Sequence, residues 1–109
     1  MARRKVKYYS AKRRAVYAAG ENIEALTVFE RDKWICGICT GLIDRRLRYP
    51  NNNCGTIDHI VEICKAIEDG WPIETIHTYA NVQAAHLSCN LEKSQNNADH
   101  GIIEETSMV

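Results

Sequence analysis

The chain has 109 residues, and its 14 Lys and Arg balance its 14 Asp and Glu, so the formal net charge is zero. This length predicts one domain with a modest hydrophobic core, and no apolar run approaches the roughly 20 residues that a membrane span needs. The odd number of cysteines, five, and an Arg-rich N-terminus without an apolar signal region argue against a secreted, disulfide-bonded protein and favour a cytoplasmic one.

The zero net charge hides an asymmetry between the two halves of the chain. Residues 1–50 hold 12 Lys and Arg against 5 Asp and Glu, whereas residues 51–109 hold 2 against 9. The halves therefore carry formal charges of +7 and −7. A basic half suits a polyanionic partner and an acidic half suits a divalent cation, although a solvated surface with unevenly placed charges gives the same pattern.

The N-terminal part of the chain predicts two helices. Residues 1–9 are expected to form a flexible basic arm, and a helix capped by Ser10 is expected to follow and to run to Ala19, before Gly20. A second helix is expected over Ile23–Arg31, with Asn22 as its cap. The arm and the first helix together form a basic N-terminal unit over residues 1–22.

The middle of the chain predicts a tight turn, a loop and two short strands. Trp34 and Ile35 are expected to lead as a short strand into a turn over Cys36–Cys39. Residues 44–55 are polar and predict a loop. The β-branched run Thr56–Val61 predicts a strand, and Asn81–Ala85 predicts a second strand or turn.

The remaining segments predict a connector and a helix. Residues 62–80 form a connector that has room for a short helical piece, interrupted near Pro72. A helix is expected from His86 to about Asn97, and Gly101 ends what remains of it. Residues 99–109 are expected to form a flexible tail.

Two close pairs of metal-ligand residues stand far apart in the sequence. Cys36 and Cys39 form the first pair, and His86 and Cys89 form the second. Zinc prefers four tetrahedral nitrogen and sulfur ligands, and structural zinc sites are usually built from two such pairs. We therefore predict a structural Zn²⁺ site in which Cys54 is the only credible substitute ligand.

A second pattern surrounds the zinc pairs. It consists of Asp58-His59, then Asn81, then Cys89-Asn90 with Lys93 one helical turn later. In order, spacing and residue types the chain resembles the HNH endonucleases over about residues 24–95. It resembles the zinc-stapled, phage and bacterial form of this His-Me finger family. The resemblance implies a small α+β fold in which a ββα-metal finger core is joined to a structural zinc knuckle and N-terminal helices.

The resemblance also implies a role for each residue of the second pattern. His59 would be the general base that activates water, and Asp58 and Asn90 would hold one divalent cation, Mg²⁺ or another. Asn81 would tie the loop and help to orient His59. The last position of the family pattern is Asn90 here rather than His, which is a frequent variant, and His86 stands where most relatives have Cys.

The same residue types suit phosphodiester hydrolysis on chemical grounds. A histidine titrates near neutrality and can take a proton from water. A hard cation prefers the oxygen ligands that Asp58 and Asn90 offer, and it can stabilise a departing 3′ oxygen. Because neighbours on a strand point to opposite faces, we expect a bulge or bend that lets Asp58 and His59 serve one site.

Basic side chains are the candidates for contacts with nucleic acid, because phosphate contacts supply most of the affinity in such complexes. They lie in the N-terminal helix, in the polar loop and on the C-terminal helix. The candidates are Arg13, Arg14, Arg45, Arg46, Arg48 and Lys93.

These patterns together predict a metal-dependent DNA endonuclease, nicking or double-strand cleaving, whose nuclease domain spans residues 23–98. Two alternatives stay open: a zinc-containing module that binds nucleic acid without cleaving it, and a ribonuclease. The small free-standing format within the family implies a phage origin, hence the host cytoplasm, and terminase subunits of a DNA-packaging machine as partners. The sequence leaves the oligomeric state open.

Overall fold

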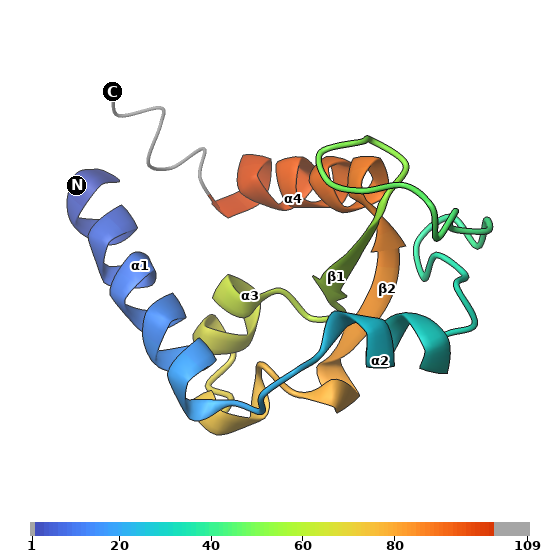
Figure 1. Ribbon diagram of the computed structural model, residues 1–109. Helices are drawn as coiled ribbons and strands as arrows, with labels where there is room; N and C mark the ends of the chain where they lie inside the picture. Colours follow the sequence, from blue (N-terminus) through green and yellow to red (C-terminus); the bar gives the residue numbers. More distant parts are fainter. Residues whose placement is uncertain (1, 102–109) are drawn as a thin grey trace.

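A computed structural model describes residues 2–101 of the chain, and the side chains of residues 11–95 (Figure 1). It is a small α+β fold with a two-stranded antiparallel sheet. The elements in chain order are α1 (Ala2–Ala19), α2 (Ala25–Arg31), β1 (Gly55–His59), α3 (Ile63–Glu68), two short 3-10 turns (Ile73–Thr75 and Tyr79–Asn81), β2 (Val82–His86) and α4 (Leu87–Gly101). No helix in this described part is long and apolar enough to cross a membrane.

The sheet pairs β1 with β2 in a continuous antiparallel register. Gly55 lies opposite His86 and His59 lies opposite Val82, and every residue between them pairs in step. Of the expected bulge or bend at Asp58 and His59, the bulge is therefore excluded. The strand instead ends at His59, and the chain bends at the next two residues.

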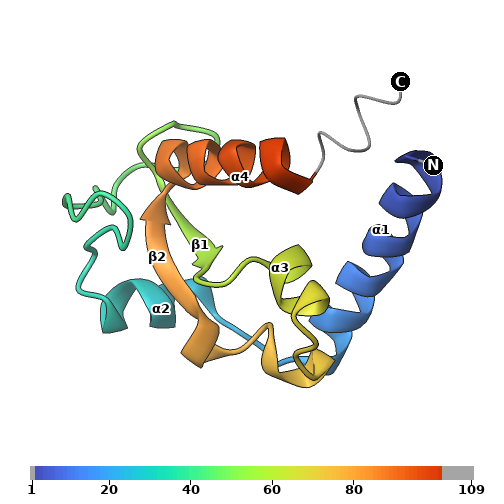
Figure 2. The same cartoon turned by 180° about the vertical axis from the view of Figure 1, so that it is seen from behind.

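Helices flank the sheet on more than one side. Helices α2 and α4 both pack against the two strands, and α3 packs against α1. Both views show α1 along one edge of the molecule, with α3 between it and the sheet (Figure 1 and Figure 2). The end of β2 runs directly into α4, so the last strand residue and the first helical turn lie together.

Two hydrophobic clusters hold the elements in place. The first joins α2 and β2 to the segment that follows α2, and it contains Val28, Cys36, Ile43, Val82, Ala84 and Ala85. The second joins α1, α3 and the segment before β2, and it contains Val16, Ile63, Ala66 and Ile76. Full burial of each Val or Ile contributes about 1.5–3 kcal/mol. Ile57 of strand β1 packs against the first cluster, and Val61, two residues past the strand, packs against the second.

Both N-terminal helices differ from expectation at their starts. Helix α1 begins at Ala2 rather than at Ser10, so residues 2–9 of the expected arm are helical. Their Ala, Arg and Lys residues are strong helix formers, and extending a formed helix is far cheaper than nucleating one. Helix α2 begins at Ala25 after the N-cap Glu24, not after Asn22. The backbone N–H of Glu24 donates to the Tyr79 hydroxyl, so a contact distant in sequence sets this boundary.

The remaining elements follow the expected order with shifted limits. The connector contains α3 and two 3-10 turns, and Trp34–Ile35 contributes one isolated bridge, Ile35 to Leu42, instead of a strand. His86 closes β2 rather than opening α4. Helix α4 extends to Gly101, so the first residues of the expected tail are helical, and residues 102–109 lie outside the described part.

Candidate functional site

A tight turn over residues 36–41, called here the cysteine turn, presents the first two metal-ligand candidates. Its backbone is closed by the N–H of Cys36, which donates to the Gly41 carbonyl over 2.8 Å, and by the N–H of Thr40, which donates to the Cys36 carbonyl over 2.9 Å. Thr40 has a φ of 65°, in the left-handed region that tight turns require. The Gly37 N–H donates to Ala84 over 2.8 Å, which docks the turn on strand β2.

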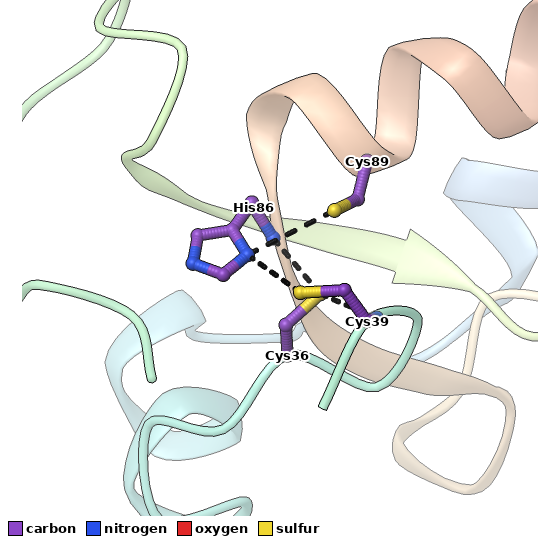
Figure 3. Close-up of side chains that lie close together, drawn as sticks. All are labelled: Cys36, Cys39, His86 and Cys89. Carbon is purple, nitrogen blue, oxygen red and sulfur yellow. Dashed lines mark hydrogen bonds between the residues drawn. The ribbon is translucent and has the colours of Figure 1, made fainter. Parts of the chain in front are cut away.

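The four predicted zinc ligands come together in one cluster. The ligand atoms of Cys36, Cys39, His86 and Cys89 all lie within 4.8 Å of one another (Figure 3). The His86 Nδ1 lies 3.3 Å from the Cys39 Sγ and 3.8 Å from the Cys89 Sγ. Zn–S and Zn–N bonds of about 2.3 and 2.0 Å in a tetrahedron place neighbouring ligand atoms about 3.5–3.8 Å apart. The Cys₃His cluster is therefore compatible with a structural metal such as zinc.

Backbone groups around the cluster form hydrogen bonds with two of its side chains, Cys36 and His86. The N–H groups of Ile38, Cys39 and His86 each donate to the Cys36 Sγ over 3.4 Å. The His86 Nε2 lies 3.0 Å from the Leu42 carbonyl oxygen. A carbonyl oxygen can only accept a hydrogen bond, so this ring nitrogen must be the donor. His86 therefore carries its proton on Nε2, and its Nδ1 lone pair is free for a metal.

The thiol pKa values differ across the cluster. Burial raises the pKa of Cys36, but the backbone N–H donors of Cys39, His86 and Ile38 outweigh it and lower that pKa to about 6. Burial, with hydrogen bonds to Cys39 and Cys36, raises the pKa of Cys89 to about 12. Three thiolates at this spacing repel one another, so full ionisation of the cluster requires a bound cation.

A polar pocket at the end of β1 forms the second part of the site. It has a volume of about 180 Å³ and lies between α1, β1, the start of α3 and α4. Three of the four residues with a predicted catalytic role line it: Asp58, His59 and Asn90. The fourth, Asn81, does not. Arg13, Tyr17 and Ser94 also line it.

Asp58 is buried and paired. Its side chain is 3% exposed, and its Oδ2 accepts hydrogen bonds of 2.9 Å from the Gln83 Nε2 and from the Lys93 Nζ. The Lys93 ammonium also donates to the His59 carbonyl over 2.8 Å. Lys93 is therefore turned inward, and its predicted phosphate contact would require it to leave this ion pair.

His59 is paired with a second histidine. The His59 Nε2 lies 2.9 Å from the His77 Nδ1, and the Tyr17 ring stands edge-on to both imidazoles. Burial, followed by the nearby His77, lowers the pKa of His59 to about 4, although Asp58 opposes this shift. His59 is therefore uncharged at neutral pH and can accept a proton.

The two asparagines fix the backbone around the pocket. Asn81 is buried, and its amide donates to the Val61 and Ile76 carbonyls while its Oδ1 accepts from the Val61 N–H, each over 3.0 Å. It thereby ties the chain just after His59 to the segment before β2. The Asn90 Nδ2 donates to the Thr56 hydroxyl over 3.1 Å and to the Ile57 carbonyl over 3.2 Å.

The arginines predicted to contact nucleic acid lie in two places. Arg13 lines the polar pocket, and Arg14 is exposed on the same helix. The other three belong to the polar loop, where Arg45 stacks over Trp34 at 4.9 Å and Arg46 pairs with Asp44 at 2.9 Å. The loop arginines are thus on the surface but partly engaged with their neighbours.

Gln83 and His77 are among the residues of the site to which the sequence patterns gave no role. Gln83 stands opposite Asp58 in the antiparallel register, so a correct strand alignment would have found it. His77 lies in the connector, where no periodicity marks it, and only the tertiary fold brings it to His59.

Comparisons of the chain with protein-family models, with curated proteins and with solved structures found no match. The geometry of the cluster and the pocket is therefore the basis for the function proposed below.

Proposed function

We propose that this chain is a metal-dependent DNA endonuclease of the HNH type. The observation that carries the proposal is the shared pocket of Asp58, His59 and Asn90. A carboxylate, an uncharged imidazole and a carboxamide around one polar cavity are the groups that hydrolysis of a phosphodiester needs. The adjacency of Cys89 and Asn90 supports the proposal further. A metal bound by Cys89 at the start of α4 would also hold Asn90, the next residue, in its place in the pocket.

The order of the elements also supports the finer fold proposal, a ββα-metal finger. Strands β1 and β2 form an antiparallel pair, and α4 packs against both. The proposed base ends β1, and the proposed zinc ligand His86 ends β2. Strand β2 would thus present a zinc ligand at the start of α4, and β1 would present the proposed base beside the following turns of that helix.

The donor atoms of the pocket suit a hard divalent cation such as Mg²⁺. Among the hydrogen bonds of the described residues, both that reach the Asp58 carboxylate go to Oδ2, which leaves Oδ1 for a cation. Asn90 uses its Nδ2 as the donor to β1, which leaves its carbonyl oxygen for the same purpose. When bound there, such a cation supplies positive charge for the phosphate and the departing 3′ oxygen.

The residues of the chain supply the rest of the chemistry. His59 takes a proton from the attacking water, which its lowered pKa permits at neutral pH. Arg13 adds a positive charge to the same pocket and can contact a phosphate there. Lys93 balances the buried charge of Asp58. This assignment leads to 5′-phosphate and 3′-hydroxyl ends.

Plasmid cleavage tests the proposal. The zinc-loaded full chain, incubated with supercoiled plasmid and Mg²⁺, is expected to give relaxed or linear DNA whose nicks a ligase reseals. His59→Ala should lower the rate by about 10²–10⁴-fold, because it removes the general base. Asn90→Ala should also lose activity, whereas its matched control Gln95→Ala, at an exposed position of α4, should keep it. Equal cleavage by wild type and His59→Ala would refute the assignment.

A second candidate function rests on the Lys93–Asp58 ion pair. Because Lys93 already neutralises Asp58 over 2.9 Å, the pocket could be silent and the chain could bind nucleic acid without cleaving it. Salt-dependent binding of DNA without cleavage in Mg²⁺ or Mn²⁺ would favour this module. Cleavage of RNA but not of DNA would favour a ribonuclease instead.

A further inference from the structure

The histidine pair beside the pocket has a geometry that restricts the protons on both rings. The His59 Nε2 and the His77 Nδ1 are 2.9 Å apart, with ring centroids separated by 5.2 Å. Two imidazole nitrogens at this distance share one hydrogen atom, since one nitrogen must donate it and the other must accept it.

His77 is held by Tyr17 in the last turns of helix α1 and by the two residues that follow this helix. The His77 carbonyl accepts a hydrogen bond of 2.8 Å from the Glu21 N–H. The Glu21 carboxylate accepts one of 2.7 Å from the N–H of Tyr79, two residues after His77. A Cβ at Gly20 would overlap the His77 carbonyl oxygen, so only glycine permits this close approach. The Tyr17 ring packs edge-on to the His77 ring at 4.6 Å. The position of His77 is therefore tied to α1.

We propose that His77 is a positioning residue for His59: its Nδ1 accepts the Nε2–H of His59 and so reserves the His59 Nδ1 for the proton of the attacking water. This inference rests on the proposed nuclease function for its purpose. The hydrogen bond selects one tautomer and one ring orientation, as the partners of working histidines do in general. Helix α1 thereby takes part in the chemistry through a residue that it holds.

A matched pair of variants separates this role from simple packing. His77→Asn keeps a hydrogen-bond acceptor about where the His77 Nδ1 lies. His77→Leu introduces a side chain of nearly the same shape as Asn that has no acceptor. In the plasmid assay with zinc-loaded full chain and Mg²⁺, the Leu variant should lose about 10- to 100-fold in kcat with little change in KM. The Asn variant should recover most of that loss. If the Leu variant does not fold, His77→Phe replaces it, because Phe keeps the ring contact with Tyr17.

An NMR measurement of the ring nitrogens distinguishes failure of this inference from failure of the proposed function. Long-range ¹H–¹⁵N spectra should show His59 as a single Nε2–H tautomer in the wild type and in His77→Asn, and a tautomer mixture in the apolar variant. That pattern supports the positioning role even if the plasmid assay of the wild type refutes the nuclease. An unchanged His59 tautomer in the apolar variant would overturn the inference. Where the wild type cleaves, equal cleavage by the Asn and apolar variants would overturn it as well.

Discussion

Asp32 joins helix α2 to the sheet through a single carboxylate. Its Oδ2 accepts the N–H of buried Ala84 over 2.8 Å, and Arg31 pairs with the same group at 2.7 Å. Arg31 in turn donates to the Val82 carbonyl, also over 2.7 Å. The carboxylate thus satisfies a strand N–H that has no partner across the two-stranded sheet on that side, next to the point where the cysteine turn docks.

Removing this carboxylate should destabilise the protein. Asp32→Ala leaves the Ala84 N–H without its acceptor, so we expect a loss of about 1–3 kcal/mol in the free energy of unfolding. Urea titration at neutral pH measures it, and Glu30→Ala at an exposed position of the same helix is the control. An equal effect of the two substitutions would show that the hydrogen bond contributes little.

The same carboxylate predicts a pH dependence. The hydrogen bond from Arg31, the largest cause, and that from the Ala84 N–H keep the pKa of Asp32 below its ordinary value. A lowered folded pKa means that the stabilisation is fully present above the unfolded value, about 3.9, and is lost as the pH falls through the folded one. The stability gap between wild type and Asp32→Ala should therefore narrow in acid. A gap that widens in acid would contradict this assignment.

Residue spacing predicted the Cys₃His cluster but not the histidine pair. Cys36, Cys39, His86 and Cys89 come in two short-range pairs, and short-range spacing is visible in a sequence. Asp58 and Asn90 line one pocket, and their role as ligands of a cation stays a prediction. His77 meets His59 only because the end of α1 carries it there, which no local pattern encodes.

Helix α1 forms part of the pocket. It contributes Arg13 and Tyr17 to the lining, and Gly20, the residue after its end, lies against the chain at His77. The boundaries of the helices were the part least predictable from sequence. The start of α2 depends on Tyr79, which lies 55 residues further along the chain.

A methyl group at the end of α1 tests this close fit. Gly20→Ala should force the helix away from His77 and lower the free energy of unfolding by about 1–3 kcal/mol, as overpacking does. Thermal or urea unfolding measures the change, and Ala18→Ser at an exposed position of the same helix should stay within about 0.5 kcal/mol of wild type. A Gly20→Ala protein as stable as the control would show that α1 does not lie against His77.

At the scale of the whole molecule, the Cys₃His cluster connects segments that are far apart in sequence. A metal bound there would fasten the cysteine turn to the junction of β2 and α4, beside the first hydrophobic cluster. A chain of this size buries a limited core, so a structural metal would contribute directly to its folding.

Metal analysis tests the cluster independently of catalysis. The purified chain should bind one zinc ion per molecule, and Cys89→Ser should lose the metal and much of its stability. Cys64→Ser, which removes a cysteine outside the cluster, should keep both. Full zinc content in Cys89→Ser, or none in the wild type after reconstitution, would exclude the cluster as a zinc site.

The most direct test of the account measures plasmid cleavage by the same preparation before and after zinc removal, with excess Mg²⁺ present throughout. If the cluster holds the start of α4, and thereby Asn90, in the pocket, zinc-loaded protein cleaves and zinc-free protein does not. Added zinc then restores cleavage to the zinc-free protein. His59→Ala, the control, does not cleave in either state. Undiminished cleavage by the zinc-free chain would contradict the proposed dependence of the pocket on the cluster.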